Sequence, residues 1–169
     1  MFWRSTCVLG VAATLSCALG GCSDSDAEVA PGAGGSVVLE GTVSCAGDPR
    51  LDTYTANMDK PGELGVLSFQ FSDLEPAPPA KGSNTFHVRV SDASGALVEG
   101  DLGVALRMPD HGHGTSVKPV VSDTAIGTYT VTPLYLFMAG VWRIEFDAYR
   151  GADVSQPVDS VALHFCVEG

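Results

Sequence analysis

From residue 37 onward, apolar and polar residues alternate in short runs. The clearest alternation occurs in the runs 86–90 and 142–146, whose apolar members are Phe86, Val88, Val90, Trp142, Ile144 and Phe146. A period of two is typical of strands with one buried face, because successive side chains of a strand point to opposite sides. No stretch of this part of the chain has the spacing of a long amphipathic helix.

Gly, Pro, Asp and Asn separate about eight such runs and indicate turns between them. The predicted strands lie at 37–45, 52–58, 65–71, 86–90, 102–108, 129–136, 142–146 and 161–165, with a shorter piece at 117–121. Pro133 fits its run only at a bulge or at an edge. Short strands joined by turns predict an all-β domain over 37–169, an immunoglobulin-like antiparallel β-sandwich, with a closed barrel as the alternative.

Residues 1–21 have the pattern of an export signal. Arg4 gives a positive start, 5–18 is an apolar run too short to span a bilayer comfortably, and Leu19-Gly20-Gly21 precedes Cys22. A buried N-terminal helix is the alternative. The segment Leu19–Cys22 resembles the lipobox of bacterial lipoproteins, and this resemblance implies cleavage before Cys22 and lipidation of that cysteine.

Residues 22–36 are then the lipidated cysteine and a flexible tether, because the segment is rich in Gly, Ser, Ala and acidic residues and lacks periodicity. Several acyl chains together anchor a protein durably. Among lipoproteins of two-membrane bacteria, Ser23 favours the outer membrane over retention at the inner one. The expected location is the cell envelope, with the domain held by its lipid anchor at the outer membrane and facing the periplasm.

After loss of the signal and acylation of Cys22, only Cys45 and Cys166 remain. Two cysteines near the ends of an exported domain predict one disulfide; two buried thiols are the alternative. The chain carries 9 Lys and Arg against 20 Asp and Glu, a net charge of −11. This acidity disfavours nucleic-acid binding. No motif for a nucleophile, a phosphate loop or a zinc protease is present, so we expect no enzyme.

The segment 108–114 concentrates candidate chemistry at the end of a predicted strand, because it holds Met108, Asp110, His111 and His113. Imidazole with thioether suits copper, whereas imidazole with carboxylate suits zinc or Cu(II). The strand directions place the turn at 137–140, with Met138, at the same end of the sandwich, and bring His87 near it. Met108 also shares the parity of the core, Met138 could simply close the sandwich end, and His-Gly-His could be a hydrogen-bonded turn.

The motif Met108-Pro109-Asp110-His111-Gly112-His113, with the later run Phe137-Met138-Ala139-Gly140-Val141-Trp142, resembles the YtkA-like domain family, which is related to FixH-like proteins. The resemblance spans roughly 76–148. It implies a small exported or membrane-associated β-sandwich with links to copper handling, and as candidate ligands at most Met108, His111, His113 and Met138. Two functions follow: copper binding or delivery, or a non-catalytic module that docks an envelope protein without metal.

Overall fold

The computed structural model of the chain describes residues 44–45, 47–151 and 154–169. The expected signal peptide, Cys22, the tether and most of the run 37–45 lie outside these residues. Within the described part no helix is long and apolar enough to cross a membrane.

The described residues contain nine strands, joined by turns and loops, and no helix. In chain order they are β1 (Met58–Pro61), β2 (Leu67–Glu75), β3 (Gly82–Asp92), β4 (Leu102–Met108), β5 (His113–Gly114), β6 (Val120–Ala125), β7 (Thr128–Leu136), β8 (Gly140–Ala148) and β9 (Asp159–Val167). The strands predicted from 65 onward correspond to β2, β3, β4, β6, β7, β8 and β9, with shifted ends.

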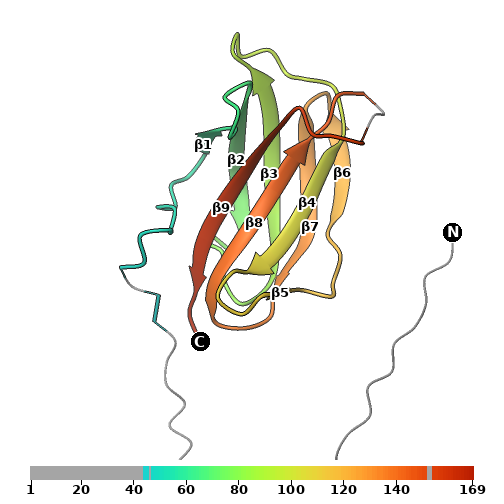
Figure 1. Cartoon of the computed structure of the whole chain (residues 1–169). Coiled ribbons are helices and arrows are strands. Elements are labelled where there is room, and N and C mark those ends of the chain that lie inside the picture. Colours follow the sequence, from blue (N-terminus) through green and yellow to red (C-terminus); the bar gives the residue numbers. More distant parts are fainter. Residues whose placement is uncertain (1–43, 46, 152–153) are drawn as a thin grey trace, which may run out of the picture. The chain divides into compact units, whose positions relative to one another are not determined.

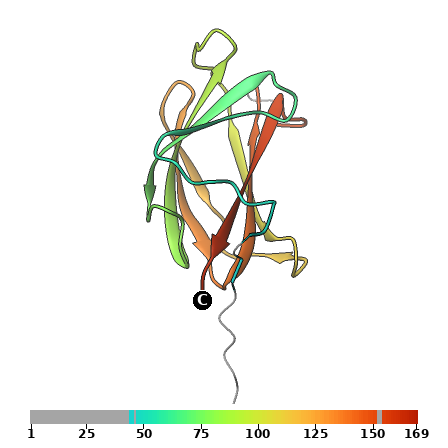
Figure 2. The ribbon, with the colours of Figure 1, turned by 90° about the vertical axis from the view of Figure 1, so that its left-hand side faces the viewer.

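The strands form two antiparallel sheets that pack face to face (Figures 1 and 2). One sheet has five strands in the order β1-β2-β3-β7-β6, and the other has four in the order β5-β4-β8-β9. The predicted all-β sandwich is therefore confirmed. The closed barrel is wrong, because the strands divide between two separate sheets.

Aromatic side chains fill the space between the sheets, as the alternation predicted. Phe71 and Phe86 of the five-stranded sheet contact Phe146 of the other sheet, with ring centroids 5.0 and 6.2 Å away. Trp142, which precedes Phe146 on the same face of β8, is also fully buried. Such aromatic pairs add about 1 kcal/mol each beyond their buried area. The core thus fixes which side of each strand faces outward.

Pro133 lies at a bulge. Asn84 pairs with Leu134 and Phe86 with Val131, so Thr132 and Pro133 together face the single residue Thr85. The bulge changes the parity of β7, so that both Val131 before it and Leu134 after it are buried. This bulge, which the sequence had left as one of two possibilities, carries β7 to the rim described below.

The predicted strand at 52–58 is wrong. Residues 47–57, which we name the strap, form no strand, and the first strand of the described chain begins only at Met58. The backbone N–H of Asp52 donates to the His164 carbonyl at 2.9 Å, and the His164 N–H donates to the Asp52 carboxylate at 2.8 Å. The Asp52 side chain thus accepts the hydrogen bond that a neighbouring strand would otherwise accept at the edge of β9. The alternation of apolar and polar residues does not reveal such a contact.

The predicted disulfide between Cys45 and Cys166 is present, with Cα atoms 5.6 Å apart. It joins the start of the described chain to the end of β9 across 121 residues. The alternative of two unpaired thiols is wrong. The bridge fixes the strap near the end of the sandwich at which β4 ends and β8 begins.

Candidate metal-binding rim

The histidines lie on a tight hairpin between β4 and β5. Met108 pairs with His113 across the hairpin, and the Met108 carbonyl accepts hydrogen bonds from the His111 and Gly112 N–H groups at 3.2 and 3.0 Å. Gly112 has φ of 68°, a conformation that glycine adopts without strain. The turn therefore projects His111 and His113 from a fixed backbone.

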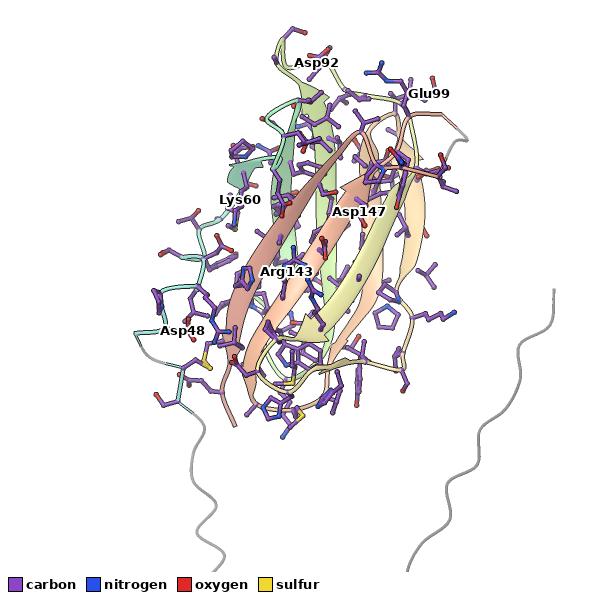
Figure 3. The ribbon with its side chains drawn as sticks, viewed as in Figure 1. Asp48, Lys60, Asp92, Glu99, Arg143 and Asp147 are labelled. Atoms are coloured by element: carbon purple, nitrogen blue, oxygen red, sulfur yellow. A yellow bond between two sulfur atoms is a disulfide. The ribbon has the colours of Figure 1, made fainter. Side chains whose placement is uncertain are left out.

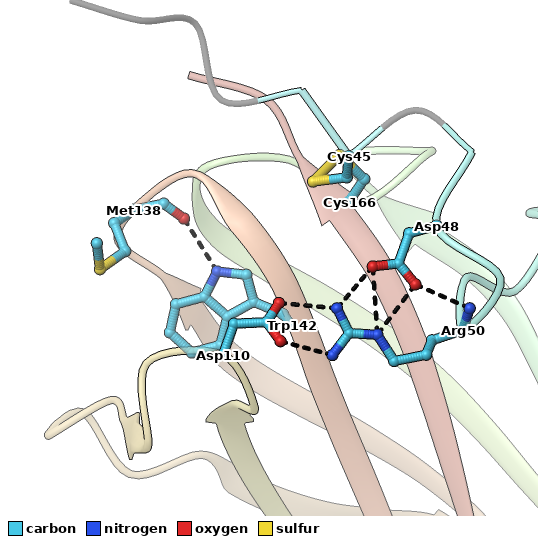
Figure 4. The surroundings of a disulfide bond; sticks show 7 residues. All are labelled: Cys45, Asp48, Arg50, Asp110, Met138, Trp142 and Cys166. Atoms are coloured by element: carbon cyan, nitrogen blue, oxygen red, sulfur yellow. Dashed lines mark hydrogen bonds and ion pairs between the residues drawn. A yellow bond between two sulfur atoms is a disulfide. The ribbon is translucent and has the colours of Figure 1, made fainter.

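The turn between β7 and β8 supplies the second group of candidate residues. The Trp142 indole N–H donates to the Met138 carbonyl at 2.9 Å (Figure 4). The Phe137 ring meets the Trp142 ring edge to face at 5.5 Å. Because Trp142 is anchored in the core, these two contacts hold the turn 137–140 in place. We call this turn and the hairpin 108–113 together the rim.

The two parts of the rim are in contact. A Cβ atom built on Gly140 would lie 2.7 Å from Met108 Cε and 3.9 Å from His111 Nε2. The His113 ring stacks on the Phe137 ring at 5.8 Å, and the His111 and His113 rings are 5.6 Å apart. The two loops thus share one end of the sandwich, as the strand directions predicted. Glycine at position 140 leaves the space into which Met108 and His111 reach.

The four candidate ligands differ in burial. Met108 is fully buried and belongs to the core, Met138 is partly buried against that core, and His111 and His113 are exposed. The rim therefore offers thioethers on its inner side and imidazoles on its outer side. That these residues bind a metal remains a prediction.

His87, the further ligand considered from the sequence, lies elsewhere. It sits between the inward-facing Phe86 and Val88, so its side chain is on the outer face of the five-stranded sheet. There its Nδ1 is 3.1 Å from the Thr130 hydroxyl. The expectation that His87 approaches the rim is wrong, because alternation along β3 turns it away.

Asp110, at the tip of the hairpin, is held by the strap. Arg50 donates two hydrogen bonds to the Asp110 carboxylate at 2.7 and 2.8 Å. It also forms an ion pair with Asp48 (Figure 4). Hydrogen bonds from Arg50 hold the pKa of Asp110 below its ordinary value, and they lower the pKa of Asp48 to about 2. Sequence reasoning missed Arg50, since no local pattern links it to a residue sixty positions later.

The ion pair between Arg50 and Asp110 bears on which side chains of the rim can bind a metal. The Asp110 carboxylate is engaged by Arg50. Nowhere in the described residues do three or more His, Cys, Asp or Glu side chains gather closely enough to hold a metal ion. The donors predicted at the rim from the sequence are therefore two imidazoles and two thioethers, a set that suits copper.

A family model described as YtkA-like matches residues 64–147. These residues are a YtkA-like domain. The match runs from just before β2 almost to the end of β8 and includes both loops of the rim. The strap, the disulfide and β9 lie outside the match, so the Arg50 contact to Asp110 comes from beyond the YtkA-like segment.

Two solved structures of FetP from uropathogenic Escherichia coli strain F11 are similar to the chain. The protein as isolated, expressed in the periplasm, is 11% identical with a TM-score of 0.41, over 66% of this chain and 98% of that one. A copper-bound variant of FetP is 11% identical with a TM-score of 0.39, over 70% and 95%. No curated protein matches this chain.

Proposed function

We propose that this protein is an extracytoplasmic, lipid-anchored copper-binding module, and that Met108, His111, His113 and Met138 are its ligands. It binds or delivers the ion and catalyses no reaction of its own. Cys22 carries the anchor and 23–36 the tether, which hold the domain at the outer membrane facing the periplasm. The Cys45–Cys166 bridge suits such an oxidising compartment.

The observation that carries the proposal is the contact between the two loops of the rim. Met108 Cε and His111 Nε2 both border Gly140, two residues after Met138, and His113 packs on Phe137 of the same turn. Met108 and His111 therefore reach the turn that carries Met138, although the two loops are distant in the chain. Without this meeting, a lone His-Gly-His would be a weak indication of a metal site.

The donor types and their exposure both favour copper delivery. Two thioethers and two imidazoles form a soft to borderline ligand set, which matches Cu(I). Met108 and the Trp142 ring are fully buried on the inner side of the rim, while both imidazoles are exposed. An ion held partly by exposed ligands can pass to ligands of a second envelope protein.

Copper should raise the melting temperature of the chain. A ligand that binds only the folded state stabilises it by about 2.7 kcal/mol at 100 times Kd, or roughly 5–10 °C for a domain of this size. The measurement is thermal unfolding with Cu(I) and ascorbate. Cys7, Cys17 and Cys22 are replaced by serine, because free thiols also bind Cu(I).

Zinc at the same concentration is the control, and it should give a clearly smaller shift because the rim lacks a third hard ligand. An unchanged melting temperature at micromolar free copper contradicts the proposal. That result favours the other function predicted from the sequence, a module that docks an envelope protein without metal.

A further inference from the structure

The hairpin between β4 and β5 carries three metal-ligating side chains within four positions. Asp110 directly precedes His111, and His113 follows two positions later. Two imidazoles with one carboxylate are a donor set that zinc uses widely in proteins, and that Cu(II) also accepts. By the identity of its residues alone, this hairpin would therefore suit zinc as well as copper.

The structure directs the Asp110 carboxylate to the strap. Its Oδ1 accepts a hydrogen bond from Arg50 Nη1 at 2.7 Å, and its Oδ2 accepts one from Nη2 at 2.8 Å. This is the two-bond geometry in which a guanidinium matches a carboxylate. The Asp110 side chain is half exposed, so the ion pair rather than burial sets its direction. With Asp110 held in this way, no three His, Cys, Asp or Glu side chains of the described chain gather around one point.

Arg50 is itself held in place by the strap. Its Nε and Nη2 donate to the Asp48 carboxylate at 3.0 and 2.6 Å (Figure 3 labels Asp48, and Figure 4 shows the contacts). The disulfide fixes the strap shortly before Arg50, and the backbone hydrogen bond from Asp52 fixes it shortly after. One guanidinium thus joins a fixed segment to the tip of the histidine hairpin, with its N–H donors shared between two carboxylates.

We propose that Arg50 is a specificity-determining residue, which withholds the Asp110 carboxylate from metal ions and so keeps the rim selective for copper over zinc. This inference rests on the proposed function, because it concerns the metal that the same site rejects. Zinc sites in proteins have at least three protein ligands, and here the third hard donor is bound to Arg50. Cu(I) loses little by this, since thioethers and imidazoles suit it without a carboxylate.

The test is a zinc titration of Arg50→Gln, in competition with a zinc-sensitive dye, on the chain without its three N-terminal cysteines. The freed Asp110 carboxylate should raise the zinc affinity about tenfold or more, which is the lower end of the effect that partners of metal ligands have on affinity. The Cu(I) affinity should stay within about threefold, because the carboxylate is not among the copper ligands. Arg50 is exposed, so the variant should fold normally.

The double variant Arg50→Gln, Asp110→Asn shows whether the gain comes from Asp110. Its zinc affinity should return to within about twofold of the unchanged protein, because the two substitutions act on one contact and are not additive. A merely structural role of Arg50 would give a different result, since a loosened strap offers zinc no new ligand. The double variant also tests Asp48, which the loss of Arg50 releases as well.

Arg89→Gln is the matched control, because it removes the same charge from an exposed position on β3, in the other sheet. The proposal is overturned if Arg50→Gln binds zinc no more tightly than the unchanged protein, if the double variant keeps the gain, or if Arg89→Gln shows an equal gain. The zinc titration needs no copper, so its result is separate from that of the copper experiments. A chain that binds copper but shows no zinc gain in Arg50→Gln would overturn this inference alone.

Discussion

The double variant Cys45→Ser, Cys166→Ser is expected to lose about 4 kcal/mol of free energy of unfolding. The bridge spans 121 residues, and the entropy of the unfolded chain that such a crosslink removes is worth about 4–5 kcal/mol before any strain. Its loss also frees the start of the strap from the end of β9. For a domain whose stability is of the usual order of 5–15 kcal/mol, this is a large fraction.

Urea unfolding of the variant and of the unchanged protein measures this difference. Reduction of the unchanged protein should reproduce the loss, whereas reduction of the variant should change nothing further. A difference below about 1 kcal/mol between variant and unchanged protein would show that the bridge contributes little, contrary to the loop length.

The second large effect concerns copper. Replacing both His111 and His113 by alanine should lower the Cu(I) affinity at least 100-fold, because half of the proposed ligands are lost. Both side chains are exposed, so the free energy of unfolding of the metal-free protein should stay within about 0.5 kcal/mol. Competition with a Cu(I) chelator, on the chain without its three N-terminal cysteines, measures the affinity.

His87→Ala is the matched control for this experiment. His87 lies on the outer face of the other sheet, and its loss should leave the Cu(I) affinity within twofold. If the double variant keeps the affinity of the unchanged protein, the imidazoles of the rim are not ligands. An equal loss in His87→Ala would point to a different site.

Much of the fold follows from local pattern. Trp142, Ile144 and Phe146 alternate with charged residues, and this alone identifies β8 and its buried face. Where a side chain replaces the ladder, the pattern fails: Asp52 hydrogen bonds to the backbone of His164 and leaves the strap without a strand. The two-residue β5 is too short for any periodicity, so it is defined only by its pairing with β4, Met108 with His113 and Arg107 with Gly114.

The site was predictable in part for a similar reason. Strand directions are enough to bring Met138 and the histidine hairpin to one end, because that inference needs only the order of up and down. The alternation of apolar and polar residues along a strand does not reveal which strands lie beside it in the sheet. For this reason the row that Arg107, Arg143 and His164 form across the four-stranded sheet and the contact of Arg50 with Asp110 emerge only from the pairing of the sheets.

The central claim is that two distant loops present sulfur and imidazole donors to one copper ion. X-ray absorption at the copper edge, on Cu(I)-loaded chain without Cys7, Cys17 and Cys22, tests this most directly. The account predicts one tightly held copper per chain with both sulfur and imidazole nitrogen in its coordination shell. Copper that washes away, or a shell without sulfur, would contradict it.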